Sequence, residues 1–190
     1  MMAPARPVPI LEGKRIRLRA PQNADESVLY QWYNDPETVA PFDRFDIDTL
    51  DEFRAEVRRA SSDPASLAPR FVVERREDSR VLGFVGHYRA HPVLELVDVW
   101  YVLGDPGERG KGYGSEAVGL LVDYLFHDLA LVRVGATTDV ENVASVKLLE
   151  HLGFQREGIL RAALRHHGKW HDVAVYGVSR ATWADRARSE

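Results

Sequence analysis

The sequence contains no cysteine among its 190 residues, which excludes disulfide bonds, thiolate metal sites and a cysteine nucleophile. It also lacks an apolar run of the roughly 20 residues that a membrane-spanning helix requires. Basic residues are not in surplus, because 29 acidic residues exceed 25 basic ones and give a net charge of −4. That balance disfavours nucleic acid as a partner. We therefore expect a cytoplasmic protein that binds neither membrane nor nucleic acid.

The composition is that of a folded chain, with 45% hydrophobic and 28% charged residues. A chain of this length can bury one substantial core. Residues 1–9 are rich in proline and alanine, and we expect them to be a flexible N-terminus. Residues 10–185 show no internal repeat and no low-complexity segment, and we expect them to form a single domain.

The first half of the chain alternates between strand and helix patterns. A strand is predicted at 15–19, and a helix from about 24 to 34. A second helix follows the capping-box pair Thr49 and Glu52. Strands at 70–76 and 81–90 flank a turn and predict a β-hairpin.

The second half begins with a strand that ends at Leu103, a glycine-rich loop and the best helix pattern in the chain. The core-facing stripe of that helix consists of Gly114, Ala117, Val118, Leu121, Val122 and Leu125. A strand at 132–138 and a helix at 142–152 follow, and strands at 154–164 and 170–178 close the chain. The order predicts an α+β fold with a mixed, mostly antiparallel central sheet of about seven strands and about four helices.

The glycine-rich loop before that helix is typical of a phosphate site, because a helix start presents unpaired N–H groups and a positive dipole end. A P-loop is excluded, since Asp105 replaces its first glycine and Gly112 replaces its magnesium-binding hydroxyl. A dinucleotide fingerprint is also disfavoured, because Ser115 stands at the place of its last glycine and parallel βαβ repeats are missing.

A third interpretation comes from a family resemblance. Residues 109–114, Arg-Gly-Lys-Gly-Tyr-Gly, match the Arg/Gln-x-x-Gly-x-Gly/Ala loop of GCN5-related N-acetyltransferases (GNAT). Residues 142–154 resemble the second cofactor-facing helix of that family, and residues 155–183 are similar to its RimJ/RimL branch and to bacterial spermidine acetyltransferases. With residues 11–21 included, the resemblance covers nearly the whole chain. It implies that residues 10–185 form one acetyltransferase domain with the GNAT fold.

The resemblance implies that acetyl-CoA is the cosubstrate and that no metal is needed. Backbone groups of the central strand would hold the pantetheine arm, and amides of the loop would hold the pyrophosphate. The implied strand and loop residues are Tyr101, Val102, Leu103, Arg109, Gly110, Lys111, Gly112, Tyr113 and Gly114. Arg109 and Lys111 would add positive charge for the phosphates, and the alternative for both is an ordinary solvated loop.

Asn142 and Ser145 lie on one face of the predicted helix, because a three-residue step stays on one side. The resemblance directs Asn142 toward the pantetheine and Ser145 toward the thioester. The alternatives are that Asn142 only caps the helix and that Ser145 bonds within its own helix.

The implied chemistry is attack of a neutral amine on the acetyl thioester. Near pH 7 an α-amine is neutral in roughly one molecule in ten, and a lysine-type amine in roughly one in 2,500. Asp98 occupies the central-strand position where relatives often carry a glutamate, and it could accept the amine proton. The alternative is a strand carboxylate paired with an arginine. Glu95 is the second choice for the base.

The general acid is not assigned by the resemblance. Many members carry a tyrosine on the second helix that protonates the departing thiolate, whereas this chain has Leu149 there. Ser145 could assist by hydrogen bonding, and Tyr101 and Tyr113 are weaker substitutes. A thiol with a pKa near about 8.5 leaves tolerably without full protonation.

The predicted function is acetyl transfer to a primary amine, with a protein N-terminal α-amine as the first choice and direct transfer in a ternary complex. A polyamine or aminoglycoside-type acceptor and a non-catalytic CoA-binding module are the alternatives. Whether the protein forms a homodimer is left open. Candidate acceptor-side residues are the loop 42–45, Trp32, Tyr88, His166, His167 and His171. The spacing of the histidines favours a solvated hairpin over a metal site.

Overall fold

The computed structural model describes residues 8–35, 49–60, 70–90, 96–166 and 168–187. The strands are β1 (Leu11–Glu12), β2 (Ile16–Arg19), β3 (Phe71–Arg75), β4 (Val81–Arg89), β5 (Val97–Leu103), β6 (Arg133–Asp139), β7 (Gln155–His166) and β8 (Lys169–Ser179). The helices are α1 (Glu26–Asn34), α2 (Leu50–Ala60), α3 (Tyr113–His127), α4 (Val143–His151) and α5 (Arg180–Ala187), with 3₁₀ turns η1 (Asn23–Asp25) and η2 (Pro106–Glu108).

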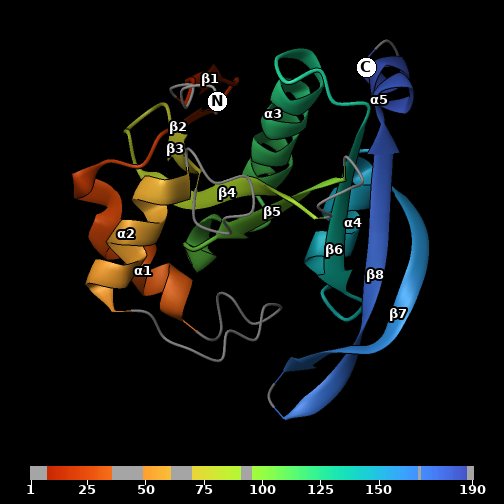
Figure 1. Cartoon of the computed structure of the whole chain (residues 1–190). Coiled ribbons are helices and arrows are strands. Elements are labelled where there is room, and N and C mark those ends of the chain that lie inside the picture. Colours follow the sequence, from red (N-terminus) through yellow and green to blue (C-terminus); the bar gives the residue numbers. More distant parts are fainter. Residues whose placement is uncertain (1–7, 36–48, 61–69, 91–95, 167, 188–190) are drawn as a thin grey trace, which may run out of the picture.

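The strands form one sheet in the order β1-β2-β3-β4-β5-β6-β8-β7, with β7 and β8 as a long hairpin at one edge (Figure 1). Neighbouring strands are antiparallel except β5 and β6, which are parallel. β4 and β5 pair along seven residues, from Gly83 opposite Leu103 to Arg89 opposite Val97. β5 and β6, in contrast, are in register only where Asp98 meets Gly135. The parallel β5–β6 pairing in the middle of the sheet therefore has the fewest residues in register.

Each face of the sheet carries its own hydrophobic cluster. One face packs against α3, whose apolar stripe is fully buried, together with residues such as Leu149, Tyr176 and Trp183. The other face packs against α1 and α2 through an aromatic cluster that includes Phe53, Phe84 and Trp100. Figure 1 shows α1 and α2 together beside the β1–β4 part of the sheet. Side chains along β5 alternate between the two clusters.

The predicted α+β class and the mostly antiparallel sheet are confirmed. The capping box is present, because the Thr49 N–H donates to Glu52 Oε2 (2.8 Å) and the Glu52 N–H donates to Thr49 Oγ1 (3.3 Å). The structure adds β1 and α5, which the sequence patterns did not indicate. Glu95, His167 and the loop 42–45 lie outside the described residues. Within the described residues, none of the helices has the length and apolar character to cross a bilayer.

Candidate functional site

The backbone of β5 has hydrogen-bonding groups that no neighbouring strand uses. The Gly104 N–H donates to the carbonyl of Leu82 in β4 (3.1 Å), and Leu103 lies opposite Gly83. This bond determines which residues of β5 direct their backbone groups toward β4. In an antiparallel pair, the backbone groups of every second residue point away from the partner strand. Those of Tyr101 and Leu103 therefore face the β6 side, where the described pairing has already ended at Asp98.

This arrangement separates the three strand residues that the resemblance indicated. Tyr101 and Leu103 direct backbone groups toward β6, and the Leu103 carbonyl accepts a bond from Arg109 Nε (3.0 Å). Val102 differs, because its backbone groups belong to the β4 ladder and its side chain is buried in the α1–α2 cluster. The geometry therefore gives Val102 a place in the core and leaves Tyr101 and Leu103 as the strand groups that a ligand could pair with.

The glycine-rich loop that follows β5 contains two residues in the left-handed region. Gly110 and Gly112 have φ values of 75° and 83°, in the left-handed region that favours glycine. Gly112 is also the N-cap of α3, and its carbonyl accepts the Glu116 N–H (3.1 Å). Gly114 is buried, and a Cβ there would meet Leu148 Cδ1 at 3.0 Å. The loop thus places the first amides of a 15-residue helix close to the end of β5.

The charged side chains of this loop are held by partners of their own. Lys111 Nζ donates to Glu108 Oε2 (2.9 Å), and Glu108 also receives Arg75 Nη1 (3.1 Å). Arg109 is fixed to Leu103 as described above. These cations therefore shape the loop through contacts with the protein itself.

Sequence reasoning missed one basic residue, Arg15, which reaches this loop from before β2. Its Nη1 donates to the Lys111 carbonyl (2.8 Å), its Nε donates to Glu116 (3.0 Å), and its guanidinium lies 4.7 Å from the centre of the Tyr113 ring. A Cβ on Gly112 would come within 3.1 Å of Arg15 Nη2. A separation of about a hundred residues in the chain hides this contact from any local pattern.

Across the β5–β6 join, α4 contributes two polar side chains. Asn142 caps α4, because its Oδ1 accepts the Ser145 N–H (3.1 Å). The Ser145 hydroxyl does not turn back onto its own helix but meets the Tyr101 hydroxyl at an Oγ–Oη distance of 2.7 Å. Burial raises the pKa of Tyr101 to about 12, although the bond with Ser145 partly offsets that effect. The phenol therefore keeps its proton at neutral pH.

Leu149, which stands at the usual tyrosine position of the family, lies in the core. Its side chain is fully buried among the residues that pack against α3. The phenol hydroxyl near Ser145 comes instead from the strand, through Tyr101. The sequence contains Tyr101, but only the fold places it against α4.

Asp98 lies on the opposite face of β5, beside the parallel join. Its Oδ1 sits over Gly135, where a Cβ would be only 2.3 Å away. Burial raises the pKa of Asp98, while the positive charge of Arg133 lowers it and the negative charge of Glu157 raises it further. Arg133 forms its ion pair with Glu157, with an Nη1–Oε1 distance of 2.7 Å. The arginine that could have paired Asp98 is thus engaged by another carboxylate.

Trp100 is a second polar group on the Asp98 face that sequence reasoning did not select. The indole is 7% exposed, and its Nε1 has no hydrogen-bond partner among the described residues. The ring lies over Gly86, where a Cβ would meet it at 2.7 Å. A buried donor of this kind costs roughly 1–3 kcal/mol when unpaired, and an acceptor on a bound ligand would remove that cost.

Comparison with known proteins agrees with this geometry. Residues 15–155 match the family described as acetyltransferase (GNAT) domain. The uncharacterized N-acetyltransferase p20 of Bacillus licheniformis is 32% identical over 92% of this chain and 98% of its own length.

Solved structures show the same fold. Spermidine N-acetyltransferase from Vibrio cholerae, in complex with CoA and spermine, has a TM-score of 0.78 at 22% identity and covers 90% of this chain and 99% of its own. Ribosomal-protein-S5-alanine acetyltransferase from Vibrio fischeri has a TM-score of 0.74 at 22% identity, covering 92% and 98%. The predicted GNAT fold is confirmed, and the chain belongs to the GNAT family of acetyltransferases.

Proposed function

We propose that this protein is an acetyl-CoA-dependent N-acetyltransferase of the RimJ/RimL-like branch, with residues 10–185 as its acetyltransferase domain. The observation that carries the proposal is the β5–β6 join. Backbone groups of Tyr101 and Leu103 face β6 without a strand partner, directly before a loop with two left-handed glycines. An extended pantetheine arm could bond to this strand edge, and a pyrophosphate could bind the loop amides.

The cofactor site combines strand, loop and helix. Amides from Gly110 to Gly114 would bind the pyrophosphate, with Arg109 and Lys111 supplying positive charge when the phosphates compete for their present partners. Asn142 and Ser145 would face the pantetheine and the thioester from α4. Val102 would not contact the cofactor, and its side chain would only pack in the core behind the strand.

Asp98 would serve as the base, either directly or through a water molecule. A carboxylate with a raised pKa is a better proton acceptor than an ordinary aspartate, because its pKa lies nearer to the working pH. The amine nitrogen would attack the thioester carbon after losing its proton toward Asp98, and the carbon–sulfur bond would then break. Transfer would be direct, since the chain has no cysteine to carry the acetyl group.

The departing thiolate would take its proton from the Tyr101–Ser145 pair. Tyr101 is protonated at neutral pH, and its hydroxyl already bonds to the Ser145 hydroxyl. The pair would therefore replace the helix tyrosine whose position Leu149 occupies, either by donating the proton or by hydrogen bonding to the sulfur.

Two acceptor classes are supported, and they differ in charge. The S5-alanine acetyltransferase of V. fischeri supports a protein N-terminal α-amine, and the V. cholerae spermidine enzyme supports a polyamine. Polyamine acetylation places the greater demand on a base, because a lysine-type amine is neutral in only roughly one molecule in 2,500 near pH 7. The carboxylate of Asp98, beside the parallel join, would attract such a cation.

The deciding experiment measures release of CoA thiol from acetyl-CoA with Ala- and Ser-initiated peptides, spermidine, spermine and an aminoglycoside. We expect turnover with one class, and double-reciprocal plots that intersect, as a ternary complex requires. Parallel plots would contradict direct transfer. If acetyl-CoA raises the melting temperature but no amine releases CoA, the protein is the non-catalytic CoA-binding module.

A further inference from the structure

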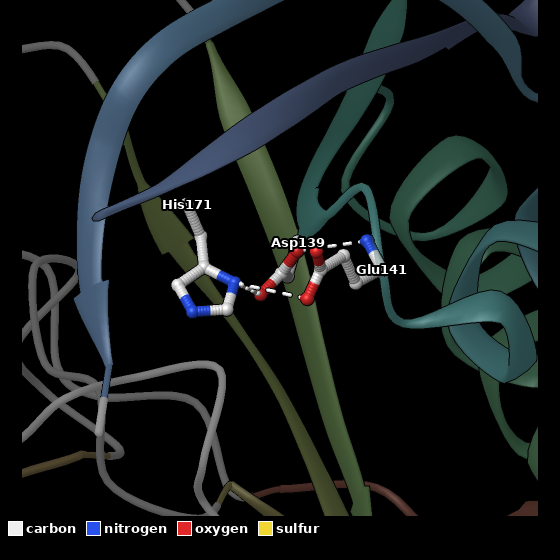
Figure 2. A group of neighbouring side chains, drawn as sticks. All are labelled: Asp139, Glu141 and His171. Carbon is white, nitrogen blue, oxygen red and sulfur yellow. Dashed lines mark hydrogen bonds and ion pairs between the residues drawn. The ribbon is translucent and has the colours of Figure 1, made fainter. Parts of the chain in front are cut away.

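Three side chains with metal-binding atoms converge at the carboxyl end of β6. Asp139 is the last residue of β6, Glu141 follows in the loop toward α4, and His171 projects from the neighbouring strand β8 (Figure 2). One ligand atom from each lies within 4.8 Å of the other two. Figure 2 shows the imidazole Nδ1 turned toward both carboxylates, while the other ring nitrogen points away from them.

The two separations from the imidazole nitrogen match those of a first coordination shell. His171 Nδ1 lies 2.9 Å from Asp139 Oδ2 and 3.4 Å from Glu141 Oε2. Ligands bound at about 2.1 Å to one ion are about 3.0 Å apart at right angles and about 3.4 Å apart at the tetrahedral angle. We propose that Asp139, Glu141 and His171 bind a divalent transition-metal ion, for which Zn²⁺ is the representative.

The backbone holds these ligands in place. The two oxygens of Asp139 are divided, since Oδ1 accepts the Glu141 N–H (2.8 Å) and Oδ2 faces the imidazole. The Val140 N–H donates to the Asp172 carbonyl (3.0 Å), which ties the loop to β8 beside His171. Outer bonds of this kind orient ligands in metal sites. Asp139 is 6% exposed, so its carboxylate has little freedom to turn away.

The donor set selects the class of ion. One imidazole nitrogen and two carboxylate oxygens suit Zn²⁺, Co²⁺, Ni²⁺ or Mn²⁺, whereas Mg²⁺ and Ca²⁺ prefer oxygen ligands alone. The spacing of the hairpin histidines alone did not indicate a metal site. Asp139 and Glu141 come from a different strand and loop, and only the sheet brings them to His171.

The site lies at the connection between β6 and α4. The Asn142 N–H donates to the Asp139 carbonyl (3.0 Å), and Asn142 caps the helix that carries Ser145. A bound ion would neutralise two carboxylates and fix this connection to β8. The ion would therefore act on the rigidity of the α4 start, and its binding does not depend on the proposed acetyl transfer.

The test uses the full chain, freed of metal with EDTA and desalted. Isothermal titration with Zn²⁺ and the visible absorption of Co²⁺ should both show one ion per chain, and Zn²⁺ should raise the melting temperature. His171→Asn should abolish binding, and Glu141→Gln, at an exposed ligand, should weaken it by more than about tenfold. A tenfold excess of Mg²⁺ should leave the Zn²⁺ titration unchanged.

Matched substitutions at exposed residues provide the controls. His127→Asn, at the end of α3, and Glu77→Gln, in the β3–β4 turn, should bind Zn²⁺ as the unaltered chain does. Absence of stoichiometric binding, or equal binding by the ligand and control variants, overturns the proposal and leaves a charged hydrogen-bonded cluster. Weaker spermidine binding by Glu141→Gln without metal binding would overturn it too, and would assign the cluster to a substrate ammonium group.

Discussion

The hydroxyl of Tyr101 meets that of Ser145 between β5 and α4, on the face that is packed against α3. Asp98, three residues earlier in the strand, faces the other side. In the proposed mechanism, Asp98 accepts a proton on one face of β5 and Tyr101 donates a proton on the other. The thioester would bind between them. Because the two residues are separated by the sheet, their roles can be tested independently.

Replacing Tyr101 by Phe keeps the ring packing and removes the proposed proton donor. We expect kcat to fall by about a hundredfold, with little change in the KM for acetyl-CoA, since general acid catalysis contributes about 10²–10⁴. Ser145→Ala should lower kcat as well. The double variant should lose much less than the product of the two effects, because the hydroxyls act as one pair. If the kcat losses of the two single variants multiply in the double variant, the two hydroxyls act independently.

Asp98→Asn removes the proposed base. Turnover should fall by about a hundredfold at pH 7 and by less at pH 9.5, because more of the amine is already neutral there. The loss should be larger for spermidine than for an α-amine peptide. Asp51→Asn, at a 92% exposed carboxylate on α2, should leave turnover unchanged. If Asp98→Asn turns over as fast as the unaltered chain at every pH, Asp98 is not the base.

The raised pKa of Asp98 also predicts how its effect on stability depends on pH. The folded state holds this proton more tightly than the unfolded chain, whose aspartate pKa is near 3.8. Stability contributed by Asp98 is therefore present below pH 3.8 and is lost as the pH rises through the raised value. Asp98→Asn should raise the melting temperature more at pH 7 than at pH 4.

The loop from β5 to α3 depends on glycine at one position in particular. Gly112 combines a φ of 83° with the N-cap position of α3 and a guanidinium 3.1 Å from its missing Cβ. Gly112→Ala should weaken acetyl-CoA binding by roughly five- to thirtyfold in a titration, because a loop that relaxes out of αL must regain that conformation at a cost of roughly 1–2 kcal/mol. Gly119→Ala, inside α3 with its nearest neighbour at 3.9 Å, should bind normally. Equal binding by both variants would remove the loop from the site.

The parallel join of β5 and β6 depends on a second glycine. A side chain at Gly135 would collide with Asp98 Oδ1 at 2.3 Å. Gly135→Ala should displace Asp98, destabilise the chain and lower turnover, as measured by thermal unfolding and CoA release. The double variant Gly135→Ala/Asp98→Ala should recover stability but not turnover. Recovery of both would show that Asp98 is only a packing residue.

At the scale of the whole molecule, a buried ion network connects the N-terminal strands with the helical layer. Arg19 bonds to Asp25 of η1 (Nη1–Oδ2 2.6 Å) and to Glu74 of β3, and all three side chains are at most 10% exposed. Arg19→Met would leave two buried carboxylates without this partner. We expect a loss of about 3 kcal/mol, or roughly 6–12 °C in melting temperature. Arg161→Met, at an exposed position on β7, should change it by less than about 2 °C.

The local features of the fold could be predicted because local spacing determines them. The α3 stripe, the Thr49 capping box and the hairpins follow from periodicity and turn residues. Helix α5 was missed because its apolar content is low, apart from Trp183, which packs into the core. Strand β1 has only two residues, too few to show a period.

The contacts of the candidate site were less predictable because they join distant parts of the chain. The loop and the strand were recognised from the residues at 101–114, yet the bond between Tyr101 and Ser145 spans 44 positions. The position of Leu149 in the core, the guanidinium of Arg15 at the loop and the convergence of His171 with Asp139 all result from strand order. No local pattern contains that order.

The single register point between β5 and β6 would let the proposed cofactor stabilise the folded chain. An extended molecule bonded along β5 would act as a missing strand and bind only the native chain. At a concentration one hundred times its dissociation constant it would add about 2.7 kcal/mol to the free energy of unfolding. Resistance to proteolysis would then rise with the concentration of the acyl donor.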